Sequence, residues 1–428
     1  MTAAQTDVLI VGAGQSGATA AAALREFGYQ GRILMVGAER LPPYERPPLS
    51  KAILAGTSSV GDILVHPAGF HENKAIEMLP GVQVISLDAA AHTALLSDGQ
   101  SIGYGHCLIA TGGRARTVEG LVPGTPRVHY LRTMADALRL REEMCQQRSV
   151  LVVGGGFLGL EVASTARAMG LSATVLESAD RVLARAVPPA MSTWLEQRIE
   201  LAGVDLRLNA RCESFAVEAS GVTARLSTGG DVSADLILVA VGLEPEVEVA
   251  RQAGMAIHDV NRGIRVDARC ATNAPDIFAV GDCCSQFHPF MDAEVRLESW
   301  QSANEQARLA AAAIAGVATN GLNAPWFWSD QFGCNLQMLG VPVAGLTYYS
   351  RGSIGAPAEA PKFMLLGANE SGQILHAIAV NAGGDLRQLK PLVDGKMPCD
   401  PVALCEQSAP LRQLVRAALA RTPFPTTN

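Results

Sequence analysis

Two apolar runs, each followed by a glycine-rich turn and an alanine-rich stretch, form the strongest pattern along this chain. They are Val8–Val11 and Val150–Val153. Unbroken β-branched runs predict buried strands, because a parallel sheet that is covered on both faces has no polar face to alternate with. The alanine-rich stretches that follow predict helices. We therefore expect two strand–turn–helix units of the Rossmann type, about 140 residues apart.

Both turns carry the glycine spacing of dinucleotide-binding sites. The glycines are Gly12, Gly14 and Gly17 in the first turn, and Gly154, Gly156 and Gly159 in the second. Glycine allows a tight turn and lets the backbone approach a pyrophosphate, whose charge faces the helix N-terminus. An acidic residue, Glu39 or Glu177, ends the next predicted strand, where a carboxylate accepts hydrogen bonds from a ribose 2′-hydroxyl. Two complete fingerprints predict two dinucleotides bound together, as in electron transfer between a nicotinamide and a flavin.

Further apolar runs end in glycine or acidic turns and predict additional buried strands. These runs occupy 106–113, 234–242 and 276–282. Residues 298–315 are alanine-rich with helical periodicity, and a break near 319–321 precedes alternating segments of different texture. The pattern predicts an α/β fold with two Rossmann-like dinucleotide-binding domains, followed by a C-terminal α+β domain.

Composition narrows the class of protein. The 428 residues are 48% hydrophobic, and the net charge of −7 argues against nonspecific nucleic-acid binding. No run of about 18 apolar residues indicates a membrane span, and the N-terminus lacks the pattern of a signal peptide, so we expect a cytoplasmic enzyme without membrane attachment. The nine cysteines include no C-x-x-C pair, so we expect no iron–sulfur or zinc site and no reactive dithiol.

The order of short motifs resembles that of the NADH-dependent ferredoxin reductases that serve Rieske-type dioxygenases and bacterial haem monooxygenases. The motifs are PYERPPLSK at 43–51, YLRT at 130–133, GGGFLGLE at 154–161, AVGDC at 279–283, RLESW at 296–300 and PWFWSDQ at 325–331. The resemblance covers nearly the whole chain. It implies a glutathione-reductase-like fold with an FAD-binding domain from 1–114 and 244–318, an NAD-binding domain at 115–243 and a C-terminal α+β domain at 319–428.

The resemblance implies that the first fingerprint holds FAD. Ser16 then joins the three glycines at the pyrophosphate, and Glu39 holds the adenosine ribose. Arg46 places a positive charge near the phosphates, and Asp282 hydrogen-bonds the ribityl chain; the alternatives are a solvated arginine and an aspartate that only caps a helix. Other positions that the resemblance implies for cofactor binding are Val84, Thr111, Gly112, Arg132, Gly242, Gly281 and Trp300.

By the same resemblance the second fingerprint is an NADH site, with Leu158 among its glycines. Glu177 favours NADH over NADPH, because its carboxylate repels a 2′-phosphate. Arg181 and Arg185 follow four and eight residues later. We expect both to contact the pyrophosphate or the adenine, and they leave NADPH use as the alternative.

Lys51 and Glu161 are the expected catalytic residues. Hydride transfer to a flavin leaves negative charge on its ring, and we expect the Lys51 ammonium to stabilise that charge. Glu161 lies on the predicted helix after the second fingerprint, and it either reaches the nicotinamide or pairs with Lys51. The alternative is that both are unrelated surface charges. We expect no metal ligand set.

The resemblance implies that a [2Fe–2S] ferredoxin accepts the electrons singly and passes them to a terminal oxygenase. Such ferredoxins are commonly acidic, so docking requires a local basic patch on this acidic protein. Candidates for the patch, with ordinary solvated charges as the alternative, are Arg296, Arg387, Lys390 and Lys396. We expect a monomer or a homodimer.

Two other functions stay open. Monodehydroascorbate and rubredoxin reductases share the proline-rich flavin segment, although PWFWSDQ favours a ferredoxin reductase. A signalling flavoprotein similar to apoptosis-inducing factor shares PPLSK, but that family usually adds targeting segments, and none is evident in the sequence.

Overall fold

The computed structural model describes residues 4–355 and 360–421. These residues form two compact units, and each unit contains one of the two glycine fingerprints. Unit 1 contains the residues up to 46 together with 58–114 and 243–322. Unit 2 contains 47–57, 115–242 and the residues from 323 onward. The short segment 47–57 therefore folds with unit 2, although the residues on both sides of it fold with unit 1.

Unit 1 is built around a seven-stranded sheet. Its order is β3 (Ile76–Pro80), β2 (Ile33–Gly37), β1 (Ala4–Val11), β6 (Ser101–Ile109), β5 (Thr93–Leu96) and β4 (Val84–Asp88), and β18 (Ile277–Ala279) pairs with β6. Strands β1, β2, β3, β6 and β18 are parallel, whereas β4 and β5 pair antiparallel. The chain moves outward from β1 to β3 and then returns to β6 beside β1. This reversal is the switch point of a Rossmann sheet, where ligands bind at the carboxyl ends of the strands.

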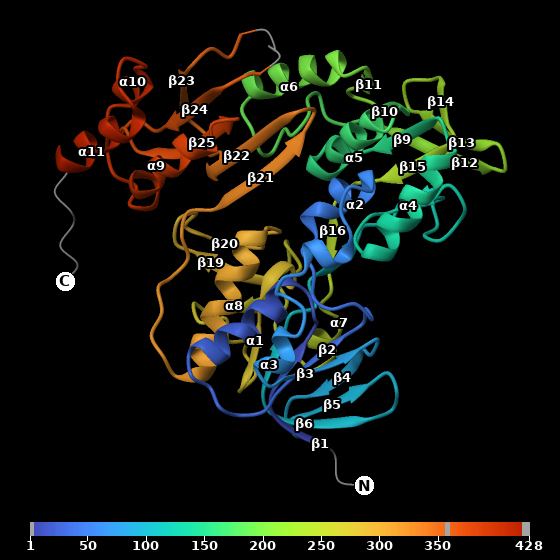
Figure 1. Cartoon of the computed structure of the whole chain (residues 1–428), viewed down its shortest axis with the longest axis vertical. Coiled ribbons are helices and arrows are strands. Elements are labelled where there is room, and N and C mark those ends of the chain that lie inside the picture. The colour runs from blue at the N-terminus through green and yellow to red at the C-terminus, as the bar shows by residue number, and fades with distance from the viewer. Residues whose placement is uncertain (1–3, 356–359, 422–428) are drawn as a thin grey trace. The chain divides into compact units, whose positions relative to one another are not determined.

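Helices α1 (Gln15–Glu26) and α8 (Trp300–Ala315) lie side by side in unit 1 (Figure 1). Their buried faces consist largely of alanine, including Ala20, Ala21 and Ala23 on α1 and Ala307, Ala310 and Ala311 on α8. These alanines belong to the same core as the apolar residues of β1 and β2. Small side chains let the two helices pack closely on the sheet, which accounts for the alanine-rich stretches of the sequence.

The remaining elements of unit 1 are short. They are η2 (Val60–Ile63), α3 (Phe70–Asn73), β16 (Leu243–Pro245), α7 (Glu248–Gln252), β17 (Ile264–Val266), η3 (Gly281–Cys283), β19 (Cys284–His288) and β20 (Ala293–Val295), and β7 (Gly113–Ala115) begins in this unit. Strands β17, β19 and β20 form a small sheet of their own. Because η3 follows β18, Asp282 lies at the carboxyl end of a strand in the central sheet.

Unit 2 repeats the Rossmann order. Its parallel sheet runs β11 (Val204–Arg207), β10 (Ser172–Leu176), β9 (Ser149–Val153), β15 (Leu236–Val239) and β8 (Val128–His129). Helix α5 (Phe157–Ala168) follows β9 after the second glycine turn. The other elements are η1 (Pro47–Ser50), α2 (Ala52–Ala55), α4 (Met134–Gln146), α6 (Pro189–Leu201), β12 (Cys212–Glu218), β13 (Gly221–Leu226) and β14 (Asp231–Ala234).

The C-terminal part of unit 2 is an antiparallel sheet with helices. The sheet order is β21 (Trp326–Gln331), β22 (Cys334–Gly340), β25 (Ile374–Val380), β24 (Phe363–Ala368) and β23 (Thr347–Arg351). Helix α9 (Gly383–Asp394) buries three leucines against β22 and β25, and α10 (Pro401–Cys405) and α11 (Leu411–Arg421) follow (Figure 1). The predicted α/β fold with a C-terminal α+β part is confirmed. Within the described ranges, no helix combines the length and apolarity needed to cross a membrane.

Candidate functional site

The first glycine turn connects β1 to α1 and is shaped by its own backbone. Gly12 has a φ of +114°, and a Cβ on it would lie 2.3 Å from the carbonyl oxygen of Ala110. A Cβ on Gly17 would lie 2.0 Å from the carbonyl oxygen of Gly12. Gly14 differs, because nothing lies within 4 Å of the position that its Cβ would take. The protein itself requires glycine at 12 and 17, whereas Gly14 leaves an open cradle at the N-terminus of α1, as a pyrophosphate-binding turn requires.

The second glycine turn, between β9 and α5, has nearly the same geometry. Gly154 has a φ of +111°, and its Cβ would lie 2.4 Å from the carbonyl oxygen of Ala240. A Cβ on Gly159 would lie 2.0 Å from the carbonyl oxygen of Gly154, while Gly156 has nothing within 4 Å. Leu158 is half-buried in the first turn of α5. Both turns therefore fit a dinucleotide by the same criterion.

Ser16 joins the first glycine turn to the turn after β18. Its hydroxyl oxygen lies 2.3 Å from the position of a Cβ on Gly281, which has a φ of +78°. The Gly281 N–H donates to Oε1 of Gln306 at 2.8 Å, and the Cys284 thiol donates to the same oxygen at 3.2 Å. Gln306 is only 3% exposed. Its side-chain amide therefore fixes, from inside unit 1, the backbone that carries Asp282.

The adjacent cysteines beside this turn are buried thiols. Burial raises the pKa of both Cys283 and Cys284. Cys283 donates to the carbonyl oxygen of Val280 at 3.3 Å. A reactive cysteine needs exposure and a lowered pKa, and this pair has neither. All nine cysteines are free thiols.

Glu39 lies in a network of side chains beyond β2. It accepts a hydrogen bond from the Tyr44 hydroxyl at 2.5 Å and pairs with Arg46 at 2.9 Å. Arg46 also interacts electrostatically with Asp282. Three residues predicted for FAD binding, Glu39, Arg46 and Asp282, therefore lie together in unit 1.

Glu177 is held mainly by backbone amides, and the Ser178 hydroxyl adds a longer hydrogen bond at 3.3 Å. Its carboxylate accepts hydrogen bonds from the N–H of Gly155 at 2.8 Å and from that of Ala179 at 2.8 Å. Arg181 does not turn toward a cofactor cradle, since its guanidinium donates to two carbonyl oxygens and one serine hydroxyl of the segment that follows it. Arg185 is exposed. Only Arg185 therefore remains available for the cofactor contact expected of both arginines.

Thr111 and Gly112, in the turn that follows β6, anchor the chain where it returns to unit 1. The Thr111 hydroxyl donates to the carbonyl oxygen of Glu246 at 2.5 Å, and the Glu246 N–H donates to the carbonyl oxygen of Gly112 at 2.9 Å. Gly112 has a φ of +67°. The Glu246 carboxylate pairs with Arg114 at 2.8 Å. These bonds fix the positive-φ turn that holds two of the predicted cofactor residues.

Four other predicted residues each have a local setting of their own. Val84 is 8% exposed in the core of unit 1. Gly242 has a φ of +113° with nothing within 4 Å of its Cβ position. Arg132 is half-buried, and its backbone N–H donates to the carboxylate that caps α4. The indole N–H of Trp300 donates to Glu45 at 3.3 Å.

Lys51 and Glu161 form an ion pair in unit 2, in which the Glu161 carboxylate is buried and the Lys51 side chain is half-buried. The Lys51 ammonium nitrogen lies 2.7 Å from Oε1 of Glu161, and it also donates to the carbonyl oxygen of Pro47 at 3.0 Å. Glu161 is 6% exposed, and it accepts further hydrogen bonds from the hydroxyls of Ser50 and Ser329. The structure brings the two expected catalytic residues together and adds two serines that sequence reasoning missed. Both serines stand inside motifs singled out above, PPLSK and PWFWSDQ, as small polar residues among larger neighbours.

The four basic docking candidates differ in accessibility. The Arg296 side chain is 11% exposed and pairs with Glu298 at 2.8 Å. Lys390 pairs with an aspartate one turn later on α9 at 2.6 Å. Arg387 is exposed and Lys396 is half-buried. Arg387 is therefore the most accessible of the four, and Arg296 is poorly placed to meet a partner.

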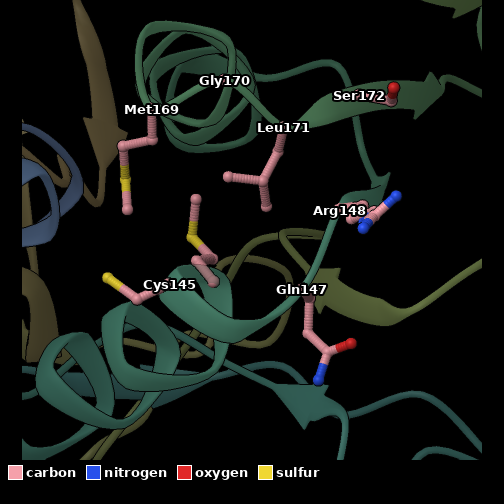
Figure 2. A pocket seen from close by; sticks show the side chains of 8 residues that line it. Cys145, Gln147, Arg148, Met169, Gly170, Leu171 and Ser172 are labelled. Atoms are coloured by element: carbon pink, nitrogen blue, oxygen red, sulfur yellow. The ribbon is translucent and has the colours of Figure 1, made fainter.

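A hollow of about 590 Å³ lies at the other end of the parallel sheet of unit 2 (Figure 2). It is lined by Met144, Cys145, Gln147, Arg148, Met169, Gly170, Leu171 and Ser172. Strands β9 and β10 start beside these residues, so the hollow faces their amino ends, whereas the glycine turn follows the carboxyl end of β9. Ligands of open α/β sheets bind at the carboxyl ends, so this hollow is separate from the predicted dinucleotide site.

Family models match the chain in two parts. A model described as pyridine nucleotide-disulphide oxidoreductase matches residues 6–307. A second model, described as reductase C-terminal, matches residues 326–415. The first match includes both glycine turns. The second covers the antiparallel sheet, from β21 to β25, and most of the helices that follow it.

Individual proteins are similar over most of the chain. The ferredoxin–NAD(+) reductase component of an anthranilate 1,2-dioxygenase system from Burkholderia cepacia is 38% identical over 405 residues, which are 94% of this chain and 98% of that protein. A rubredoxin–NAD(+) reductase from Pseudomonas putida is 39% identical over 334 residues, 78% of this chain and 86% of that protein. The crystal structure of the ferredoxin reductase for the CYP199A2 system from Rhodopseudomonas palustris has a TM-score of 0.89 at 36% identity, covering 96% of this chain and 99% of that one.

Proposed function

The chain belongs to the pyridine nucleotide-disulphide oxidoreductase family, and from this premise we propose that it is an FAD-dependent NADH:ferredoxin oxidoreductase. The observation that carries the proposal is the pair of open glycine cradles, at Gly14 and Gly156, each at the N-terminus of a helix. Two such cradles in one chain suit an enzyme that holds a flavin and a nicotinamide nucleotide together.

FAD and NADH are the cofactors of this enzyme. FAD, when bound, accepts a hydride from NADH and releases its electrons one at a time, which suits an iron–sulfur acceptor. In the proposed arrangement the FAD-binding domain comprises 1–114 and 244–318, the NAD-binding domain 115–243 and the C-terminal domain 319–428. The N-termini of α1 and α5 would each face one pyrophosphate.

In unit 1, Ser16 and the first three glycines would bind the FAD pyrophosphate, and Glu39 its adenosine ribose. Arg46 already offsets the charge of Glu39 and would add a guanidinium for the phosphates. Asp282 would receive the ribityl hydroxyls. The remaining positions that we propose for the cofactors are Val84, Thr111, Gly112, Arg132, Gly242, Gly281 and Trp300.

In unit 2, Glu177 would receive the ribose of NADH, with Leu158 beside the pyrophosphate turn and Arg185 near the adenine. Two backbone N–H groups fix the Glu177 carboxylate, so it cannot easily swing away from an incoming 2′-phosphate. Repulsion between the two anions supports a preference for NADH over NADPH.

Lys51 would supply the ammonium that stabilises negative charge developed during hydride transfer. Glu161 would keep this ammonium in one place, since the carboxylate is buried and lies 2.7 Å from the ammonium nitrogen. The mechanism asks for no nucleophile and no proton donor from the chain, and the residues of the site bind, orient and exclude water.

The proposed acceptor is a [2Fe–2S] ferredoxin that feeds a terminal oxygenase of the Rieske or haem type. The names of the relatives from Burkholderia cepacia and Rhodopseudomonas palustris support this class of acceptor. Arg387, Lys390 and Lys396 in the C-terminal part would contribute to a docking surface. The protein would act as a monomer or a homodimer.

A rubredoxin reductase is the second candidate, because a protein of that name is 39% identical to this chain. That similarity extends over 334 residues, against 405 for the ferredoxin-linked relative. The longer similarity, together with the match of the C-terminal model at 326–415, favours ferredoxin as the acceptor.

The test is an anaerobic titration of the FAD-loaded protein with NADH and separately with NADPH, followed by a [2Fe–2S] ferredoxin or a rubredoxin. We expect NADH to bleach the flavin absorbance at concentrations at least about tenfold below those of NADPH. Ferredoxin should then be reduced as the flavin colour returns. Transfer to rubredoxin alone would select the second candidate, and bleaching without transfer to either protein would reject both.

A further inference from the structure

Glu161 is the centre of a buried hydrogen-bond cluster in unit 2. Its side chain is 8% exposed, and both of its carboxylate oxygens accept hydrogen bonds. Oε1 accepts from the Lys51 ammonium at 2.7 Å and from the Ser329 hydroxyl at 2.6 Å. Oε2 accepts from the Ser50 hydroxyl at 2.5 Å. A buried carboxylate with donors on both oxygens is held in a single orientation.

The hydroxyl proton of Ser329 has one direction available to it. The side-chain amide nitrogen of Gln331 lies 3.1 Å from the Ser329 oxygen, and an amide nitrogen only donates. Ser329 therefore accepts from Gln331 and gives its own proton to Glu161. Ser329 is 0% exposed and Gln331 is 2% exposed, so this chain of hydrogen bonds reaches the carboxylate away from solvent.

Strand β21 presents Ser329 to helix α5 in a fixed register. Phe327, on the same face of the strand, packs against Phe157 with ring centroids 4.6 Å apart. Just beyond the strand, the Phe332 N–H donates to the Ser164 hydroxyl at 2.7 Å. The three partners on α5 are spaced four and then three residues apart, so they share one face of the helix. The strand is attached at three points, and only the middle one reaches the carboxylate.

Ser50 is held by the same helix from the other side of the carboxylate. The Thr165 hydroxyl donates to the Ser50 carbonyl oxygen at 2.8 Å. Thr165 lies one turn after Glu161, so two neighbouring side chains of α5 hold Ser50 by its hydroxyl and by its carbonyl. Lys51 is the next residue, and its position therefore depends on this attachment as well as on the ion pair.

We propose that Ser329 is a positioning residue of the hydride-transfer site. From the C-terminal part of the chain, it holds Glu161 in the orientation that keeps the Lys51 ammonium in place. The inference rests on the proposed function, in which Lys51 stabilises negative charge. It gives the C-terminal part a role in the chemical step that is separate from docking an acceptor, because Ser329 is fully buried and acts through Glu161.

The first test compares Ser329→Ala with Ser164→Ala in the FAD-loaded protein. Both substitutions remove one hydroxyl that joins the β21 segment to α5, but only the first removes a donor to Glu161. The readout is acetylation of Lys51 in a short pulse of an amine-reactive ester, measured by peptide mass spectrometry. Internal references are the other lysines, Lys74, Lys362, Lys390 and Lys396. We expect Lys51 labelling to accelerate about tenfold in Ser329→Ala and to stay within about twofold in Ser164→Ala.

The second readout is the anaerobic stopped-flow rate at which NADH reduces the bound flavin. We expect the limiting rate to fall about tenfold in Ser329→Ala, toward the rate of Lys51→Met, while the NADH concentration for half-maximal rate changes by less than about twofold. Ser164→Ala should keep the rate of the unaltered protein. Ser50→Ala removes the donor to the other oxygen of Glu161, and it should change both readouts in the same direction. If Ser329→Ala does not retain FAD, Ser50→Ala tests whether the hydroxyl donors to Glu161 hold the ion pair.

Several outcomes would overturn the positioning role. Unchanged Lys51 labelling in both Ser329→Ala and Ser50→Ala would do so, as would faster labelling with an unchanged rate of reduction. Equal changes in Ser329→Ala and Ser164→Ala would also do so, because attachment of the strand would then be the cause. If NADH does not reduce the unaltered protein, the proposed function fails, and the labelling pattern still supports or overturns the hold of Ser329 on the ion pair.

Discussion

The two glycine turns share one backbone geometry but secure their acidic residues by different means. Gly12 and Gly154 have φ angles of +114° and +111°, and in both turns the last glycine would place a Cβ 2.0 Å from a carbonyl oxygen of the first. Glu39 is held by the side chains of Tyr44 and Arg46. Glu177 is held mainly by two backbone N–H groups at 2.8 Å, with a longer hydrogen bond from the Ser178 hydroxyl. The difference teaches that backbone packing dictates the glycines of the turn. The partners of the acidic residue are not dictated in this way, so the charges around it differ between the two units.

The largest effect is expected from the glycines that touch backbone. Gly17→Ala and Gly159→Ala each force a Cβ onto a carbonyl oxygen, so we expect each to lower the free energy of unfolding of its unit by about 3 kcal/mol. Urea denaturation followed by circular dichroism measures this loss. Gly14→Ala and Gly156→Ala are the matched controls and should change stability by less than about 0.5 kcal/mol. An equal loss in a control would show that the geometric distinction between the glycines is wrong.

The next largest effect is expected from acid, which should destabilise unit 2 more than unit 1. His376 in unit 2 is 1% exposed, and burial lowers its pKa to about 4. The ordinary pKa of an unfolded histidine is about 6.5. Between pH 6.5 and pH 4, His376 is therefore protonated in the unfolded chain but neutral in the folded one. The contribution of neutral His376 to folding stability is complete above pH 6.5 and declines as the pH falls toward 4. We expect a loss of about 2 kcal/mol between pH 7 and pH 5.

Urea midpoints across this pH range measure the loss, and His376→Gln should flatten the profile. In unit 1, burial and the nearby His66 also lower the pKa of His71, but His71 is only half-buried. His71→Gln should therefore flatten the profile less. A steeper response from His71→Gln would contradict the assignment of the acid sensitivity to unit 2.

Substitution of the two open glycines, Gly14 and Gly156, should weaken the binding of different cofactors. A methyl group at Gly14 or Gly156 fills a cradle that the protein leaves empty, so we expect affinity losses of about tenfold. Gly14→Ala should weaken FAD retention, measured by fluorescence of released flavin. Gly156→Ala should keep FAD and weaken NADH, measured by the titration described above. The opposite pairing of variant and cofactor would exchange the roles proposed for the two turns.

The smallest effect is expected from the acids. Glu177→Gln removes a carboxylate that would face a 2′-phosphate, and we expect the preference for NADH over NADPH to fall about threefold. The ratio of kcat/KM values for the two coenzymes measures the change. Glu39→Gln is the matched substitution in unit 1 and should leave this ratio unchanged. A shift of equal size in both variants would mean that overall charge, not position, sets the preference.

Sequence reasoning reached furthest where backbone geometry dictates residue type. Only glycine fits at 12 and 17, so the fingerprint and its strand–turn–helix setting could be predicted. Ser329 and Ser50 could not be found in this way, because they lie 168 and 111 residues from Glu161 along the chain. Their role depends on how β21 and the 47–57 segment pack on α5.

Gln306 and Arg181 also show what the sequence alone could not predict. The contacts of Gln306 were missed, and the contact expected of Arg181 is not the one that forms. Gln306 is one of three side-chain amides in an alanine-rich helix, and its partners on the Gly281 turn emerge only from the packing of α8. Arg181 has the right spacing for a cofactor contact, but the carbonyl groups of the next segment take up its guanidinium. A pattern can mark a polar residue, but the competition among its partners is decided by tertiary structure.

The excursion of residues 47–57 into unit 2 has a consequence for anyone who divides this protein into pieces. A fragment cut at 115 and 242 contains a complete parallel sheet and the second glycine turn, but it lacks Lys51, Ser50 and Ser329. Glu161 would then keep its place on α5 without its ammonium and its two hydroxyls, and the face of α5 that packs against β21 and the 47–57 segment would be uncovered. The same holds for chimaeras, in which a transplanted nucleotide-binding domain must bring the eleven-residue segment and β21 with it.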